Sequence, residues 1–306
     1  MLRLEILRNV NADHFAVVTE LLSAAERADG QRALSDHLWL DLRQGGRTGF
    51  AAILGWEHDH DHPVAYSQVS RGNDSWSIDV VVHPHHRYDM AAIGPQMLNA
   101  AIETVCNEGG GHVHWWVFEP TSTHHTLASK VGLSPGRELI QMKRSLPLEQ
   151  HLISRTTGFI TRPFILGKDN EEWLAVNNLA FVEHAEQGGW DNATFLSRTN
   201  EPWFNPEGFL IHIRDNEMAG FCWTKLHPRE SRPPVGEIYV IAVNPAHGGQ
   251  GLGTLLTLAG LQALAHQGAI EAMLYVDRDN TGAVTMYERI GFTSNHRERA
   301  FVGDVH

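Results

Sequence analysis

The sequence predicts an α/β (α+β) fold made of two consecutive copies of one unit, and three observations carry this prediction. The chain has 306 residues, a length typical of about two domains. Apolar residues make up 42% of it, enough to fill ordinary packed cores. His83-Pro84 and Asn244-Pro245 lie 161 positions apart, and Gly132 and Gly291, each expected to end a short helix, lie 159 apart. The same order of elements stands between these markers in both halves.

The first copy, which we place at residues 1–148, begins with a helix over 11–34. Phe15, Val18 and Leu21 repeat there at helical spacing, and Asn11 or Asp13 is the expected N-cap. Short runs rich in apolar and β-branched residues predict strands, and longer amphipathic stretches predict helices. The remaining elements are strands at 49–56, 64–69, 76–82, 112–118 and 137–144 and helices at 90–105 and 123–130.

The second copy, at residues 149–306, repeats this order. Strands are expected at 160–163, 209–213, 218–225, 238–243 and 272–276, and helices at 169–181, 192–198, after the glycines near 250, and at 281–290. Two independent copies of one α/β unit account for the length, the composition and the pattern together.

A glycine-rich turn follows the strand at 238–243. Gly248, Gly249, Gly251 and Gly253 fall within six residues and precede a helix with one apolar face. Glycine lets backbone N–H groups turn inward, and a helix start aims its free N–H groups at one point, so a phosphate is the natural guest. A glycine-rich connection without a ligand is the simpler alternative.

Two other phosphate motifs do not fit this turn. A P-loop needs Lys-Ser or Lys-Thr after the glycines, and a dinucleotide fold needs a glycine at position 256, which is leucine. At the repeat offset the first copy has Asp89, Met90 and Ala92 where the second has Gln250, Gly251 and Gly253. We therefore expect a degraded cofactor loop in the first domain.

Composition excludes several classes of function. The formal net charge is −12 and no cluster of Lys and Arg stands out, which argues against nucleic-acid binding. Charges interrupt the apolar N-terminus and no run of about 18 apolar residues occurs, so we expect neither a signal peptide nor a membrane span. Cys106 and Cys222 lie in different halves, which favours inert thiols in a reducing compartment. We expect a cytoplasmic monomer.

The tract Glu57-His58-Asp59-His60-Asp61-His62 offers typical metal ligands. All of them lie in one short stretch, and the sequence provides no second cluster to close a site. We therefore favour a solvated hairpin loop and predict no metal.

The order of motifs in the second half resembles the GNAT superfamily of acetyltransferases. It comprises the strand 238–243, the turn 248–253, the strand 274–276, Asn280 and Tyr287. The resemblance implies two tandem domains, each a mixed twisted sheet flanked by helices, with acetyl-CoA as co-substrate. The usual Gln or Arg of the turn is Gly248 here, whereas the first copy keeps Arg87 at that position. The loss of that side chain puts the strength of the phosphate contact in doubt.

Further stretches resemble the mycothiol synthase family in particular; they lie at 35–37, 137–142, 177–178, 186–190, 223–228, 236–240 and 274–277. This resemblance implies an N-acetyltransferase that moves acetyl from acetyl-CoA to the cysteinyl amine of a cysteine–glucosamine–inositol conjugate, giving mycothiol. Two alternatives stay open. One is a tandem GNAT acetyltransferase for another small amine, and the other is a non-catalytic acyl-CoA-binding module.

The resemblance also implies site residues. Glu237 would be the general base and Tyr287 the acid for the leaving thiolate; a solvated carboxylate and a packed core tyrosine are the simpler alternatives. The expected cofactor contacts are Ile241, Ala242, Val243, Gly248, Gly249, Gln250, Gly251, Leu252, Gly253, Thr254, Asn280, Thr281, Gly282, Ala283, Val284 and Thr285, with a possible second cofactor site at Val81, Val82 and His83.

The expected substrate contacts are Asp36, Glu186, Lys225, Glu237 and Tyr275. Of these, we place Asp36, Glu186 and Lys225 on loops or strand ends, where each would otherwise be a solvated charge. A substrate rich in hydroxyl groups needs hydrogen-bonding side chains of this kind.

Overall fold

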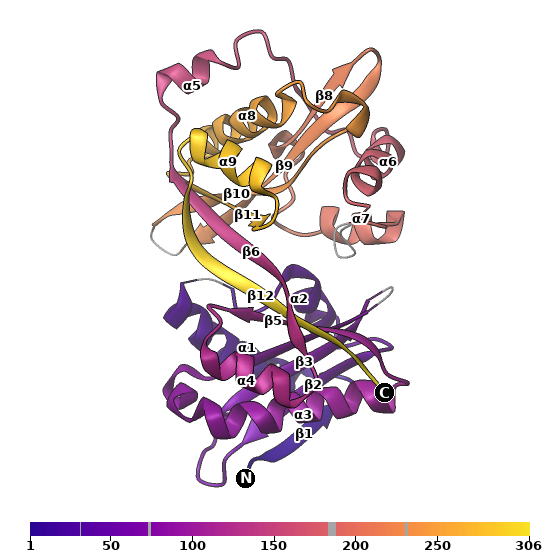
Figure 1. Ribbon diagram of the computed structural model, residues 1–306, viewed down its shortest axis with the longest axis vertical. Helices are drawn as coiled ribbons and strands as arrows, with labels where there is room; N and C mark the ends of the chain where they lie inside the picture. The colour runs from indigo at the N-terminus through magenta and orange to yellow at the C-terminus, as the bar shows by residue number, and fades with distance from the viewer. Residues whose placement is uncertain (31, 73–74, 183–187, 230–231) are drawn as a thin grey trace. The chain divides into compact units, whose positions relative to one another are not determined.

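A computed structural model describes residues 1–30, 32–72, 75–182, 188–229 and 232–306 (Figure 1). The chain forms two compact units, which we call unit 1 (Met1–Glu138 with Arg297–His306) and unit 2 (Leu139–His296). This division lies ten residues before the predicted boundary at 148, and the last ten residues belong with unit 1. The reason is that two long strands, β6 (Ser134–Ser145) and β12 (Thr293–Val305), each contribute to both units.

Unit 1 contains a mixed sheet. Its strands follow in the order β1 (Arg3–Leu7), β2 (Phe50–Trp56), β3 (Ala65–Arg71), β4 (Trp76–Val82), β5 (Gly111–Phe118) and the end of β12. Only the β4–β5 pair is parallel among these described strands. The helices are α1 (Ala12–Asp29), α2 (Asp36–Arg43), α3 (Met90–Asn107) and α4 (Ser122–Lys130), with a 3₁₀ turn, η1 (Pro84–Asp89).

Both faces of the unit 1 sheet are covered. Along β2, Ala51 and Ile53 pack against α3, whereas Phe50, Ala52 and Leu54 join the cluster under α1 and α2. This alternation follows from the two-residue period of a strand. Helix α1 begins at its predicted cap, because the Asn11 side chain accepts the His14 N–H at 2.9 Å. It stops before the predicted residue 34, since Gly30 adopts the left-handed conformation that ends helices.

Unit 2 has the strand order β6, β11 (Glu271–Asp277), β10 (Arg232–Val243), β9 (Glu217–Arg229), β8 (Phe209–Arg214) and β7 (Arg162–Pro163). The β10–β11 pair is parallel and the other pairs are antiparallel. Its helices are α5 (Gln150–Ser154), α6 (Asn170–Ala180), α7 (Asn192–Thr199), α8 (Leu252–His266) and α9 (Thr281–Arg289), with 3₁₀ turns η2 (Pro206–Gly208) and η3 (Pro245–His247). β10 begins at Arg232, before the predicted residue 238. Pro233 and Pro234 made this segment look unlike a strand, because proline is rare inside strands.

Each face of this second sheet packs on its own layer of helices (Figure 1). Helices α8 and α9 cover an aliphatic cluster, where a Cβ added to Gly260 would lie 2.5 Å from the Cys222 sulfur. Only glycine permits that close approach. The other face carries an aromatic cluster with α6 and α7, in which the rings of Phe209 and Trp223 stack at 4.5 Å. The predicted fold, two tandem mixed sheets with flanking helices, is confirmed.

An ion pair joins β7 to the start of α6. Arg162 donates two hydrogen bonds to the Asp169 carboxylate, at 2.7 and 2.8 Å, and the Ile165 N–H donates a third. These bonds, the guanidinium first, hold the pKa of Asp169 below its usual range. In the described residues we find no helix with the length and apolar character needed to cross a lipid bilayer.

Candidate active site

The glycine turn has the geometry of an anion-binding loop. Gly249 and Gly251 have φ of +73° and +74°, a backbone conformation that side-chain-bearing residues rarely adopt. Helix α8 starts directly afterwards at Leu252, and its N-cap, Gly251, has no side chain to bond the first-turn N–H groups. Those N–H groups lack partners within the helix and carry the positive end of its dipole. Gly248, Gly249 and Gly251 are exposed, so a ligand can reach the turn in front of this helix start.

The turn also receives a cation from a distant strand. Arg214, at the end of β8, donates a hydrogen bond to the Gln250 side chain and lies next to the glycines. Sequence reasoning missed this contact, because 36 residues separate the two positions. Gly248 is tightly placed, since a Cβ there would lie 3.2 Å from the Pro245 carbonyl oxygen.

A pocket of about 400 Å³ lies beside the first turns of α8 and α9. It gathers four of the predicted cofactor residues from two helices: Thr254, Thr281, Gly282 and Thr285. Its wall also contains two arginines that sequence reasoning missed, Arg155 after α5 and Arg289 at the end of α9, together with Met286 and Ile290. Both arginine side chains are exposed, and no hydrogen bond or ion pair joins either of them to another described side chain.

Asn280 is the N-cap of α9. Its side-chain oxygen accepts the Ala283 N–H at 3.1 Å, so the residue organises the helix start that borders the pocket. Ala283 and Val284 are half-buried on the same helix, against the aliphatic cluster.

Strand β10 changes its pairing in the middle of the site. It pairs with β11 from Val235 to Ile238, and no residue of β10 beyond Ile238 has a partner on β11 in the described part of the chain. The register with β9 also shifts between Ile238 and Val240, which marks a bulge at Tyr239. A bulge leaves its extra residue outside the ladder. The predicted residues Ile241, Ala242 and Val243 follow, paired with β9 on one side.

Three predicted residues share one face of this sheet. Glu237 pairs directly with Lys225 on β9 and with Met273 on β11, and Tyr275 lies two residues beyond Met273. Directly paired residues, and alternate residues along one strand, point to the same face. Lys225, Glu237 and Tyr275 therefore lie together, on the face opposite α8.

Glu237 is buried, with 8% of its surface exposed, and one of its carboxylate oxygens lies 2.6 Å from the His227 Nε2. The prediction did not include His227, although it lies two residues beyond Lys225 and so faces the same way. A carboxylate that bonds an imidazole can accept a proton and pass it on.

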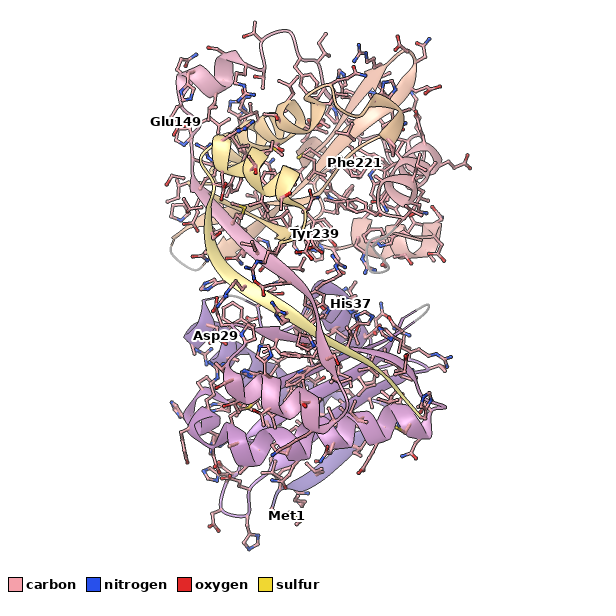
Figure 2. The ribbon with its side chains drawn as sticks, viewed as in Figure 1. Met1, Asp29, His37, Glu149, Phe221 and Tyr239 are labelled. Carbon is pink, nitrogen blue, oxygen red and sulfur yellow. The ribbon has the colours of Figure 1, made fainter. Side chains whose placement is uncertain are left out.

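Lys225 does not lie at a strand end. It pairs with Glu237 within β9 and is only 3% exposed, which corrects the prediction of a loop or strand-end position. Its ammonium nitrogen lies 4.4 Å from the Trp203 ring centre and 5.1 Å from that of Tyr239, so two aromatic faces stabilise the cation. Tyr239, on β10, and Phe221, on β9, are labelled in Figure 2.

Tyr275 is part of a polar chain. Its hydroxyl accepts a hydrogen bond from Gln141 at 2.7 Å, and the Gln141 carbonyl accepts one from Asn295 at 2.7 Å. The tyrosine is 36% exposed, so its hydroxyl is both oriented and accessible.

Tyr287 faces the opposite side of the sheet, in the aliphatic cluster under α8 and α9. It is 6% exposed and packs against Phe292 with ring centres 5.7 Å apart. Burial first, and the neighbouring Cys222 thiol second, raise the pKa of Tyr287 far above its usual range, so its hydroxyl keeps its proton. Burial likewise raises the pKa of the Cys222 thiol, in agreement with its predicted inertness.

The remaining predicted residues lie elsewhere. Asp36 is the first residue of α2 in unit 1, where the structure describes its backbone only, and Glu186 lies outside the described residues. Val81 and Val82 are buried on opposite faces of the unit 1 sheet, and His83 caps η1.

Arg87, the counterpart of Gly248, bonds Asp29 at 2.6 and 2.7 Å and the Val82 carbonyl at 3.2 Å. Asp29 is labelled in Figure 2. The guanidinium of Arg87 is therefore already engaged within unit 1.

Comparison with known proteins places this geometry in a family. Residues 173–292 match the Acetyltransferase (GNAT) family. A mycothiol acetyltransferase from Thermobispora bispora is 39% identical over 293 residues, covering 95% of this chain and 96% of that protein. Another, from Acidimicrobium ferrooxidans, is 35% identical and covers 96% of each chain.

Solved structures share the fold. A GCN5-related N-acetyltransferase from Sphaerobacter thermophilus has a TM-score of 0.73 at 20% identity, covering 98% of this chain and 95% of that one. A tandem GNAT protein from the clavulanic acid biosynthesis pathway has a TM-score of 0.66 at 17% identity, covering 99% and 98%. The similarity in sequence runs through nearly the whole length, and the chain therefore belongs to the mycothiol acetyltransferase family of GNAT acetyltransferases.

Proposed function

We propose that the chain transfers acetyl from acetyl-CoA to the cysteinyl amine of a cysteine–glucosamine–inositol conjugate, producing mycothiol. The observation that carries this proposal is the shared face of Lys225, Glu237 and Tyr275, on three adjacent strands of which β10 leads into the glycine turn. A basic group for the amine and an anion-binding loop for the co-substrate thus belong to one sheet. The names of the relatives support the same substrate.

The loop from Gly248 to Thr254 would bind the pyrophosphate of CoA through its backbone N–H groups. Arg214 would supply the side-chain charge that the family places at position 248, because its guanidinium reaches the turn through Gln250. Arg155 and Arg289 line the adjacent pocket and would attract the remaining phosphate. The pantetheine arm would lie along residues 241–243 and 280–285, where β10 has parted from β11.

Glu237 would remove the proton of the attacking amine, directly or through water, with His227 holding the carboxylate in place. Backbone N–H groups at the Tyr239 bulge would stabilise negative charge on the carbonyl oxygen. Tyr287 would protonate the sulfur that leaves; burial raises the pKa of its hydroxyl, so the proton would move only as negative charge develops on that sulfur. Holding amine and thioester together in one geometry would lower the barrier further.

The hydroxyl-rich part of the substrate needs donors and acceptors at fixed positions. Tyr275, oriented by Gln141, offers such a group, and the Lys225 ammonium between Trp203 and Tyr239 offers a charge. We assign Asp36 and Glu186 to the same substrate on the resemblance alone.

The test is a comparison of amines. The purified chain is incubated with acetyl-CoA and, in turn, the cysteinyl conjugate, free cysteine and spermidine, and CoA release is followed. We expect turnover with the conjugate, well above that with either simpler amine. Turnover only with spermidine would refute the proposed substrate and support a different small-amine acetyltransferase. Tight CoA binding without turnover of any amine would support a non-catalytic acyl-CoA-binding module.

A further inference from the structure

Five metal-ligating side chains that the acetyl transfer does not use gather at one edge of unit 1. Glu57, His60 and His62 follow β2, and His83 and His86 follow β4. β2 and β4 are each antiparallel to β3, so they run in the same direction and their carboxyl ends meet at one edge of the sheet. The second cluster that the sequence did not provide is thus supplied by the fold.

The imidazoles are packed closely enough to share an ion. The ring centre of His62 lies 5.3 Å from that of His83 and 5.8 Å from that of His86. The ring centres of His83 and His86 lie 5.8 Å apart. One ligand atom from each of these three lies within 4.8 Å of the others. Zinc–nitrogen bonds of about 2.0–2.1 Å in a tetrahedron separate the nitrogens by roughly 3.3 Å. Side-chain rotations that bring the nitrogens closer together by at most about 1.5 Å would close that difference.

We propose that His62, His83 and His86 bind one divalent transition-metal ion of the Zn²⁺ class. Three neutral imidazoles suit zinc, nickel, cobalt or copper, whereas Mg²⁺ and Ca²⁺ need oxygen ligands. His86 is 5% exposed, which gives the site a fixed inner wall, while His62 and His83 are half-buried and leave access from solvent.

One of the three rings is oriented by a carboxylate, because the His62 Nδ1 lies 3.2 Å from an Asp61 oxygen. A carboxylate bonded to one ring nitrogen fixes the tautomer and leaves the other nitrogen, Nε2, free to coordinate. Glu57 lies 3.8 Å from the His86 Nδ1, too far for a hydrogen bond but close enough to favour a cation beside that ring. His83 accepts the His85 N–H through Nδ1 at 3.3 Å, a long bond that coordination through this nitrogen would replace.

Glu57 and His60 form a second group with His86, again with ligand atoms within 4.8 Å. In our assignment they border the site without being its main ligands. At the repeat offset His83 and His86 correspond to Asn244 and His247, in the segment that leads into the glycine turn of unit 2.

The experiment titrates the untagged, EDTA-treated full chain with Co²⁺, followed by its visible ligand-field absorption, and then displaces Co²⁺ with Zn²⁺ in a calorimeter. We expect one ion per chain. His86→Gln, and separately the double change His62→Gln with His83→Gln, should weaken binding by at least about 10–100-fold. The double variant alters half-buried residues only, so it tests the site even if His86→Gln fails to fold.

His58→Gln is the matched control, because His58 is an exposed histidine of the same tract and belongs to neither group. It should bind cobalt as the parent does. Cobalt binding that is equally strong in the double variant and the parent would overturn the proposal. So would a loss of binding in a Glu57→Gln, His60→Gln variant while the double variant still binds, because the second group would then be the ligand set.

Discussion

Replacing Glu237 by glutamine should abolish most of the turnover while leaving the fold and the binding of acetyl-CoA intact. Glutamine has the shape of glutamate but cannot accept the amine proton. Its side chain can still hydrogen-bond His227, which lies 2.6 Å from the carboxylate in the parent, so we expect little change in the midpoint of thermal unfolding.

The size of the effect follows from the role of the residue. A positioned general base contributes roughly 10²–10⁴ to a rate, which corresponds to about 2.7–5.5 kcal/mol of activation free energy. Glu237 is 8% exposed, so bulk water cannot easily replace it as base. The KM for acetyl-CoA should stay within about twofold, because the glycine turn and α8 belong to the other side of β10.

The assay measures initial rates of CoA release over a range of each substrate, with the dissociation constant of acetyl-CoA determined separately. Glu288→Gln is the matched control, since Glu288 is an exposed glutamate on α9 and this change should leave kcat unaltered. A Glu237→Gln enzyme with the parent kcat would remove Glu237 as base. A weakened affinity for acetyl-CoA with normal kcat would instead assign the residue to co-substrate binding.

Four further outcomes can be checked. Tyr287→Phe should lower kcat more than tenfold without changing acetyl-CoA affinity, because a hydroxyl that protonates the leaving sulfur acts after binding; an unchanged kcat would make this tyrosine a packing residue. Arg155→Gln with Arg289→Gln should raise the KM for acetyl-CoA by roughly tenfold at unchanged kcat, measured by the same assay. Gly251→Ala should cost about 1 kcal/mol of unfolding free energy in urea, because its φ is +74° while the space around it is open. Asp169→Asn should lower the unfolding free energy by about 1–3 kcal/mol at neutral pH. That difference should shrink below about pH 4, since the unfolded carboxyl takes up its proton at a higher pH than the folded one.

Local chemistry explains what the sequence could predict. The glycine turn can be predicted from the sequence, because its positive φ values and the helix that follows depend on residues within a few positions of one another. Asn11 was predictable as an N-cap because its side chain bonds the N–H of His14, only three residues further along the chain. The tandem arrangement could be predicted because the same markers recur at nearly the same spacing, 161 and 159 positions.

Contacts made by the fold explain what the sequence could not predict. Arg214 reaches Gln250 only because β8 ends near the turn, and Arg155 meets Arg289 only at the pocket wall. A lysine in the pattern of β9 looks like a solvated charge, but pairing with β10 and two aromatic rings bury Lys225. The division between the units differs from the predicted boundary because β6 begins in unit 1 and ends in unit 2, which no local pattern in the sequence indicates.

Strand β10 explains how a buried base and a buried acid can serve one reaction. Glu237 points to the face of Lys225, and Tyr287 belongs to the cluster on the opposite face. In a continuous sheet these two groups would be separated by a layer of paired backbone. Among the described residues, β10 has no partner on β11 after Ile238, and it bulges at Tyr239. On that edge, paired backbone of β11 therefore does not separate the two faces of the sheet. A thioester held along that edge would present its carbonyl carbon to an amine beside Glu237 and its sulfur to the Tyr287 side. If Glu237 is the base and Tyr287 the acid, as we propose, this interruption of the sheet would let proton removal and proton donation occur on different sides of the reacting bond.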